Sequence, residues 1–232
     1  MKIACWSGPR NLSTAMMYAF AARGDCAVWD EPFYAPYLVR TGRADPMRDE
    51  IIASHETDPN LVGAMCGGSI PEGKSHYYMK HMALHMLPDF PLDWAESCTH
   101  VHLLRHPARV IASYSDKRDE VTADDIGFHQ QAEIFDKVGG VVVDSADIRA
   151  DPGATLRRLC EAIGLDYRPE MLRWPEGGHR SDGVWAAHWY EAIHRSTGFA
   201  GAEGDLPELT GRDAALAEEA MPHYEKLLSL KI

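Results

Sequence analysis

The chain has 232 residues, 45% of them hydrophobic and 25% charged, which suits one α/β domain with its own hydrophobic core. Its 23 basic and 35 acidic residues give a formal net charge of −12. A surface with this much negative charge repels nucleic acid and anionic membranes, and neither is therefore an expected partner. An anionic ligand would have to be held by a local cluster of basic side chains.

The cysteines and the apolar segments predict a cytoplasmic protein. The five cysteines are irregularly spaced and form no CxxC pair, which predicts neither a disulfide framework nor a zinc site. The apolar run at residues 1–6 is too short for a signal peptide. No stretch approaches the roughly 18 apolar residues that a membrane-spanning helix needs.

The first thirty residues predict a βαβ unit. Residues 2–6 are typical of a short buried strand, and a Ser-Gly-Pro sequence interrupts them. Over residues 12–23, apolar side chains recur at the three- and four-residue spacing of a helix, which Gly24 ends. A second apolar run at residues 26–29 completes the unit. We therefore expect a parallel sheet with a right-handed crossover.

The same alternation continues to about residue 168. Further strands are predicted at 76–80, 99–105 and 141–143, helices at 82–87, 107–116, 122–138 and 152–164, helix plus loop at 43–60, and an exposed loop at 67–76. The tail is irregular over 169–204 and closes with a helix at 212–230. These patterns predict a single domain over residues 1–232. Its α/β core (1–168) would hold about five mostly parallel strands with helices on both faces, and its C-terminal extension (169–232) would lie over one edge.

The loop at residues 6–14 joins the first predicted strand to the first predicted helix. Unpaired N–H groups and the positive end of the helix dipole favour a phosphate at this position. Ser13 and Thr14 add hydroxyl donors, and Arg10 adds a planar guanidinium. The spacing matches neither G-x-x-x-x-G-K-[ST] nor G-x-G-x-x-G, which disfavours ATP, GTP and NAD. The alternative is that Ser13 only caps the helix.

A second basic position lies at the end of a mid-chain strand. Arg105 follows the strand predicted at 99–105, where open α/β sheets bind ligands. Pro107 opens the next helix, and Ser113 lies on that helix within reach of the same ligand. The alternative is that Arg105 is an ordinary surface charge.

These two segments resemble the sulfotransferase family. Residues 9–14, Pro-Arg-Asn-Leu-Ser-Thr, are similar to its 5′-phosphosulfate loop and depart from it at Asn11 and Leu12, where Ser and Gly are usual. Residues 103–113 resemble its 3′-phosphate segment, a strand that ends in Arg-x-Pro with a serine eight residues after the arginine. A later strand and helix around residues 143–152 extend the resemblance, which covers residues 2–165.

The resemblance implies a P-loop NTPase-like fold and a donor, 3′-phosphoadenylyl sulfate (PAPS), that is bound without a metal. It places the 5′-phosphosulfate on Pro9, Arg10, Asn11, Leu12, Ser13 and Thr14. The 3′-phosphate would contact Arg105 and Ser113, with Arg180 from a late basic loop. Trp185 could stack on the adenine, although packing in the core is an equal alternative for a tryptophan.

Sulfuryl transfer needs a base for the acceptor and positive charge on the sulfonate and the leaving phosphate. By the resemblance, Glu31 is the expected base. Asp30 is the alternative, because side chains alternate along a strand and only one of the two can face the cleft. His81 and His85 are further candidates. They would share one helical face, but no third ligand accompanies them, so no metal site is predicted.

By the same resemblance, Arg10 and Lys80 are the cations expected to take part in catalysis. Lys80 ends the third predicted strand, as the family's lysine does, and would neutralise charge on the leaving phosphate; the alternative is a solvated lysine. The leading hypothesis is a sulfotransferase that moves a sulfuryl group from PAPS to a hydroxyl or amine of a small-molecule acceptor. A small-molecule kinase that uses ATP and Mg²⁺ is the second hypothesis, and a catalytically degenerate nucleotide-binding module is the third. The sequence leaves the acceptor and a homo-oligomer open.

Overall fold

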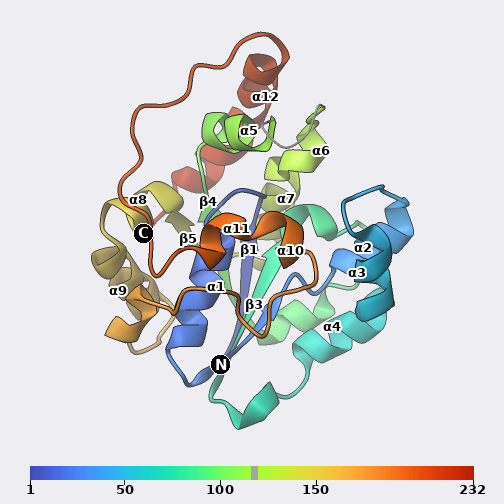
Figure 1. Cartoon of the computed structure of the whole chain (residues 1–232), viewed down its shortest axis with the longest axis vertical. Coiled ribbons are helices and arrows are strands. Elements are labelled where there is room, and N and C mark those ends of the chain that lie inside the picture. Colours follow the sequence, from blue (N-terminus) through green and yellow to red (C-terminus); the bar gives the residue numbers. More distant parts are fainter. Residues whose placement is uncertain (116–119) are drawn as a thin grey trace.

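The computed structural model describes residues 1–115 and 120–232 and is built around a five-stranded sheet (Figure 1). The strands are β1 (Lys2–Ser7), β2 (Cys26–Asp30), β3 (His76–Met82), β4 (Thr99–Leu104) and β5 (Val141–Asp144). Their order across the sheet is β2-β3-β1-β4-β5, and each neighbouring pair is parallel. The expected α/β class is therefore confirmed.

β1 lies in the middle of the sheet because it is apolar on both faces. Ile3 and Cys5 pack into the core cluster that contains helix α1 (Ser13–Ala22). Ala4 and Trp6, which alternate with them, pack into the cluster on the opposite face. This period of two is that of a strand buried on both sides.

Helices cover both faces of the sheet. The first face carries α1, α8 (Ser145–Ala150) and α9 (Pro152–Ala162). The second carries α4 (Pro59–Gly67), α7 (Phe128–Val138) and the 3₁₀ helix η3 (Asp93–Ser97). Beside β4 and β5, α5 (Pro107–Ser115) packs against α12 (Gly211–Leu228). The expected end of α5 at Asp116 lies outside the described residues.

Several predicted segments differ from the structure in detail. The helix expected at 122–138 is divided into α6 (Ala123–Ile126) and α7, because Gly127 between them has φ 71°. The helix expected at 82–87 is a single 3₁₀ turn, η2 (Ala83–His85), since β3 continues to Met82. Between β2 and β3 the chain also forms α2 (Tyr34–Thr41), α3 (Arg48–Ser54) and the 3₁₀ turn η1 (Pro71–Gly73).

The sequence predicted that the C-terminal extension lies over one edge of the sheet. In the structure the extension reaches further than that edge. It begins with η4 (Pro169–Leu172), and α10 (Ala186–Trp189) and α11 (Glu191–His194) then lie in front of the sheet near α1 (Figure 1). After α12, the terminal N–H of Ile232 donates to the carbonyl of Val142 on the edge strand β5. Within the described ranges, no helix combines the length and apolar character needed to cross a membrane.

Candidate functional site

A cavity of about 340 Å³ opens where the carboxyl ends of β1, β2, β3 and β4 meet. The loop after β1 and Arg105 after β4 form one side, and Glu31 after β2 and Lys80 on β3 form another. Trp189 and Tyr190 in the C-terminal extension also line it. The cavity lies where the chain order reverses around β1, which is the usual ligand position in an open parallel sheet.

The loop after β1 presents the N-terminus of α1 to this cavity. Leu12 precedes the helix with φ 44° and ψ 5°, and its side chain makes no capping hydrogen bond. Ser13 is therefore the first helical residue and not the cap, and both Ser13 and Thr14 line the cavity. Leu12 thus adopts the left-handed conformation that glycine favours, at a cost of about 1 kcal/mol or more.

Asn11 fixes this loop to the sheet. Its side-chain amide donates to the carbonyl of Leu103 on β4 at 2.7 Å, and the residue is 3% exposed. Gly8 allows the loop to pass close to α6, because a Cβ there would lie 2.5 Å from the carbonyl oxygen of Ile126. Asn11 and Gly8 together fix the position of the loop. Asn11, which stands where the family usually has Ser, provides the hydrogen bond to β4.

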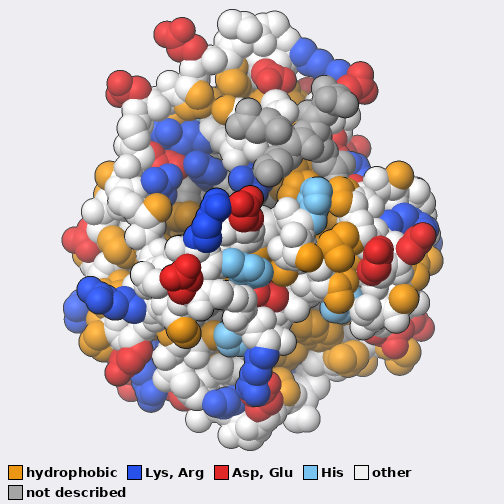
Figure 2. Space-filling model, viewed as in Figure 1, with side chains coloured by type: hydrophobic (Ala, Val, Ile, Leu, Met, Phe, Trp, Pro, Cys, Tyr) orange, Lys and Arg blue, Asp and Glu red, His pale blue; other side chains and the backbone are white. Residues whose placement is uncertain are grey.

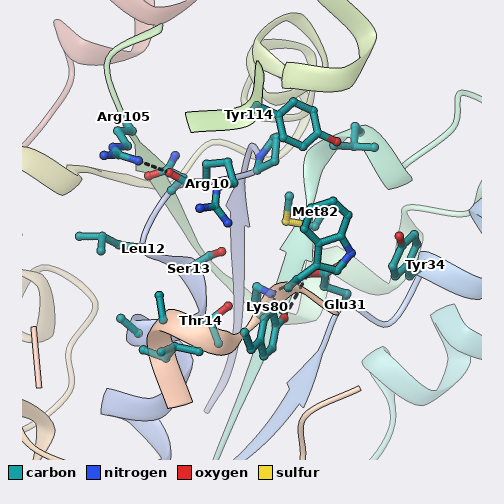
Figure 3. A pocket seen from close by; sticks show the side chains of 18 of the residues that line it. Arg10, Leu12, Ser13, Thr14, Glu31, Tyr34, Lys80, Met82, Arg105 and Tyr114 are labelled. Atoms are coloured by element: carbon teal, nitrogen blue, oxygen red, sulfur yellow. Dashed lines mark hydrogen bonds and ion pairs between the residues drawn. The ribbon is translucent and has the colours of Figure 1, made fainter. Parts of the chain in front are cut away.

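The two segments that the sequence assigned to one nucleotide meet at this edge of the sheet (Figure 3). Arg105 Nη1 donates to the backbone carbonyl of Arg10 at 2.6 Å. Arg10 Nε donates to Ser113 Oγ at 2.9 Å. Arg10, Arg105 and Ser113 therefore form one connected group, although they come from the loop after β1, the end of β4 and α5. A buried carboxylate also contacts Arg105: Glu203 from the C-terminal extension accepts from its Nη2 at 2.7 Å.

A buried polar cluster occupies the opposite side of the cavity. Lys80 Nζ donates to Glu31 Oε1 at 2.6 Å, to Asp30 Oδ1 at 2.9 Å and to the hydroxyl of Tyr190 at 2.5 Å. Burial lowers the pKa of Lys80, but the charges of Asp30 and Glu31 outweigh it and hold this pKa well above the usual value. Lys80 is therefore a cation at neutral pH.

The family follows from a match over nearly the whole chain. The family model for the sulfotransferase domain matches residues 1–230. The chain belongs to the sulfotransferase family. The segments that carried the resemblance in the sequence are thus the ones that the fold brings together.

Two proteins of Arabidopsis thaliana are similar in sequence to this sulfotransferase domain. The chain is 32% identical over 231 residues to branched-chain-amino-acid aminotransferase-like protein 2 of Arabidopsis thaliana, and 33% identical over 230 residues to the similarly named protein 1. Each match covers 97% of the chain but 41% of the relative. The chain thus spans about two fifths of the length of these relatives.

Two solved sulfotransferase domains share the fold. The domain from the Synechococcus PCC 7002 olefin synthase matches with a TM-score of 0.50 and 17% identity, covering 94% of each chain. The domain from the curacin biosynthetic pathway matches with a TM-score of 0.54 and 14% identity, covering 94% of this chain and 96% of its own. At these identities the likeness concerns the fold alone.

Of the two neighbouring carboxylates of the sulfotransferase domain, only Glu31 lines the cavity. Asp30 is 1% exposed and accepts hydrogen bonds from the hydroxyl of Tyr190 at 2.8 Å and from the N–H of Gly183 at 3.2 Å. Asp30 thus joins the end of β2 to the C-terminal extension, whereas the carboxylate of Glu31 lies next to Lys80 at the cavity wall (Figure 3).

The two histidine candidates are separated by the fold. His81 belongs to β3 and stacks on Trp6, with ring centroids 4.5 Å apart, whereas His85 lies in η2. His85 lines the cavity with Nδ1 3.8 Å from Glu31 Oε2. Burial lowers the pKa of each to about 3, so both are neutral and weakly basic at pH 7. The helical face that they were expected to share does not exist.

Two residues assigned to the nucleotide lie elsewhere. Arg180 is exposed and pairs with Glu72, and it does not line the cavity. Trp185 is 1% exposed, and its indole N–H donates to the hydroxyl of Tyr190 at 3.1 Å. A buried indole cannot stack on an adenine, so the packing alternative holds for Trp185 in this structure.

Tyr190 and Glu203 are site residues that the sequence analysis missed. The Tyr190 hydroxyl accepts from Lys80 and Trp185 and donates to Asp30. Both residues lie in the irregular tail, where no periodic pattern or motif indicated which side chains point inward. Only their contacts with strand ends far away in the sequence identify them.

Proposed function

We propose that this sulfotransferase domain transfers a sulfuryl group from PAPS to a hydroxyl or amine of a small acceptor. The observation that carries the proposal is the hydrogen bond between Arg105 and the backbone of Arg10. It brings a helix N-terminus and a strand-end arginine to one cavity, as a nucleotide with phosphates on both its 5′ and 3′ positions requires. When bound, PAPS would supply an activated sulfuryl group.

The residues present fit such a donor. The N-terminus of α1 has no side-chain cap, and Ser13 and Thr14 add two hydroxyl donors at the cavity. Arg105 already holds an anion, the carboxylate of Glu203, so it is placed to hold a phosphate. Among the described residues, there is no group of three or more His, Cys, Asp or Glu side chains that could hold a metal ion. Metal-free binding stays a prediction.

The other side of the cavity provides the proton chemistry. Glu31 accepts the proton of the acceptor hydroxyl or amine, and the salt bridge with Lys80 orients the carboxylate. Lys80 also neutralises negative charge that develops on the leaving phosphate, and Arg10 does the same from the loop. The acceptor would approach past Tyr34, Met82 and His85, which line the cavity beyond Glu31.

Calorimetry with adenosine 3′,5′-bisphosphate and with ATP–Mg²⁺ separates this function from the kinase hypothesis. We expect the bisphosphate to bind without Mg²⁺ and to bind more tightly than ATP–Mg²⁺, because the loop lacks the Gly-Lys-Ser/Thr that holds a triphosphate and Mg²⁺. Binding of ATP–Mg²⁺ without binding of the bisphosphate would refute the proposal. Binding of the bisphosphate without release of it from PAPS, across hydroxyl and amine acceptors, would instead favour a degenerate module.

A further inference from the structure

Three arginines surround a single carboxylate next to the proposed donor site. Glu203 Oε1 accepts from Arg105 Nε and Nη2 at 3.1 and 2.7 Å and from Arg149 Nη1 at 2.9 Å. Arg109 Nε lies 3.0 Å from its other oxygen, Oε2. These arginines come from the end of β4, from α5 and from α8, so the site is assembled by the fold rather than by a local motif.

The carboxylate does not balance the charge of this cluster. Three guanidinium groups carry +3 and Glu203 carries −1, which leaves a formal excess of +2. Burial acts to raise the pKa of Glu203, but its hydrogen bonds with Arg105 and the three arginine charges outweigh burial and hold this pKa below its usual value. A phosphate group carries about two negative charges and three acceptor oxygens, so it matches three arginines better than one carboxylate does.

The segment that carries Glu203 is held mainly by the same arginines. Residues 200–205 contain no helix or strand, and the Glu203 side chain is 4% exposed although Gly201, Ala202, Gly204 and Asp205 are exposed. Arg149 Nε donates to the carbonyl of Gly201 at 2.8 Å, and Arg109 Nη2 donates to that of Gly204. On the face shown in Figure 2, basic side chains gather at the upper left, where Figure 1 shows the loop that leads to α12. A ligand that bound these arginines in place of Glu203 would release residues 200–205.

We propose that Arg109 and Arg149 join Arg105 in binding the 3′-phosphate of the donor, and that Glu203 is a displaceable occupant of this site. Donor binding then exchanges one anion for another and frees residues 201–205 from the surface. This inference rests on the proposed function, which supplies the 3′-phosphate. Arg105 was expected at this phosphate from the family resemblance, whereas Arg109, Arg149 and the exchange with Glu203 come from the contacts in the structure.

The test compares Glu203→Gln with Glu208→Gln, a change of the same charge at an exposed position in the same connection. Calorimetry measures adenosine 3′,5′-bisphosphate and adenosine 5′-monophosphate, which lacks the 3′-phosphate. We expect Glu203→Gln to bind the bisphosphate on the order of tenfold more tightly, because the competing carboxylate charge is gone. The affinity for the monophosphate should change by less than about twofold in both variants, because this ligand has no 3′-phosphate to place among the arginines. The affinity for the bisphosphate should change as little with Glu208→Gln, because this variant keeps Glu203 among the arginines.

The outcomes separate this inference from the proposed function. If the unmodified protein binds the bisphosphate and Glu203→Gln binds it no better, the exchange is wrong and the proposed function stands. If neither protein binds the bisphosphate, the proposed function fails and the exchange fails with it.

Hydrogen exchange on the unmodified protein decides the question if Glu203→Gln does not fold. The bisphosphate should speed amide exchange across residues 201–205, and the monophosphate should not. Unchanged or slower exchange with bound bisphosphate would overturn the displacement.

Discussion

Glu31 and Asp30 are adjacent in sequence, but their backbones and surroundings give them different roles. Glu31 has φ 42°, a left-handed conformation that costs about 1–3 kcal/mol for a residue other than glycine. This turn ends β2 and leaves Glu31 at the cavity wall, while Asp30 keeps the strand conformation and its bonds to Tyr190 and Gly183. A strained backbone at a cavity carboxylate agrees with the proposed role of Glu31 as the base.

Glu31→Gln should therefore lose turnover while it keeps the donor. Removal of a general base costs about 10²- to 10⁴-fold in rate, whereas the donor contacts expected at Arg10 and Arg105 are unchanged. Turnover is read as release of adenosine 3′,5′-bisphosphate from PAPS, and affinity is read by calorimetry with the bisphosphate. Glu50→Gln, at an exposed position of α3, is the matched control. Full activity of Glu31→Gln would remove Glu31 from the role of base.

At the scale of elements, the N-terminus of α1 depends on the left-handed conformation of Leu12. The family resemblance predicts glycine at this position, and the structure shows that leucine keeps the conformation that glycine would adopt. The side chain of Leu12 is half-buried against the core cluster below α1, and this packing offsets part of the backbone strain. Leucine at this position therefore takes up a conformation that glycine would adopt without strain.

Substitution of Leu12 tests this reading of the loop. Leu12→Val places a β-branched side chain at φ 44° and should lower the free energy of unfolding by about 1–3 kcal/mol, with a matching loss of bisphosphate affinity. Leu12→Gly should keep the affinity within about twofold, because glycine adopts this conformation without strain. Urea unfolding and calorimetry measure the two quantities. Equal bisphosphate affinities of the two variants would show that the conformation of residue 12 does not matter for the site.

At the scale of the whole molecule, buried neutral histidines make stability depend on pH. His81 is 1% exposed between Trp6 and Trp94, and neither ring nitrogen has a hydrogen-bond partner. Burial, with smaller effects from His100 and His85, lowers its pKa to about 3. In the unfolded chain the same group has a pKa of about 6.5, so the unfolded state binds more protons at mildly acid pH. The stabilising effect of neutral His81 is present above pH 6.5 and is lost as the pH falls below it.

His81→Phe should weaken this dependence on pH. Between pH 6 and pH 5, the free energy of unfolding of the variant should fall by about 1 kcal/mol less than that of the unmodified protein, since one proton-binding group has gone. Urea unfolding at the two pH values measures the difference. His188→Gln, at an exposed position, should leave the slope unchanged. The same slope in His81→Phe would mean that His81 takes up its proton in the folded state.

The sequence by itself determined the alternation of strands and helices and the positions of Arg10 and Arg105 at two strand ends. These features follow from the spacing of apolar residues and from loop motifs, both of which involve residues that are close together in the sequence. Tertiary structure decided that Glu31 rather than Asp30 lines the cavity, that Trp185 is buried, and that Glu203 lies among three arginines. Each of these outcomes depends on contacts between segments far apart in sequence, often from an irregular tail whose side-chain directions no period specifies. The strand order β2-β3-β1-β4-β5 likewise depends on how the strands pack against the helices on both faces of the sheet.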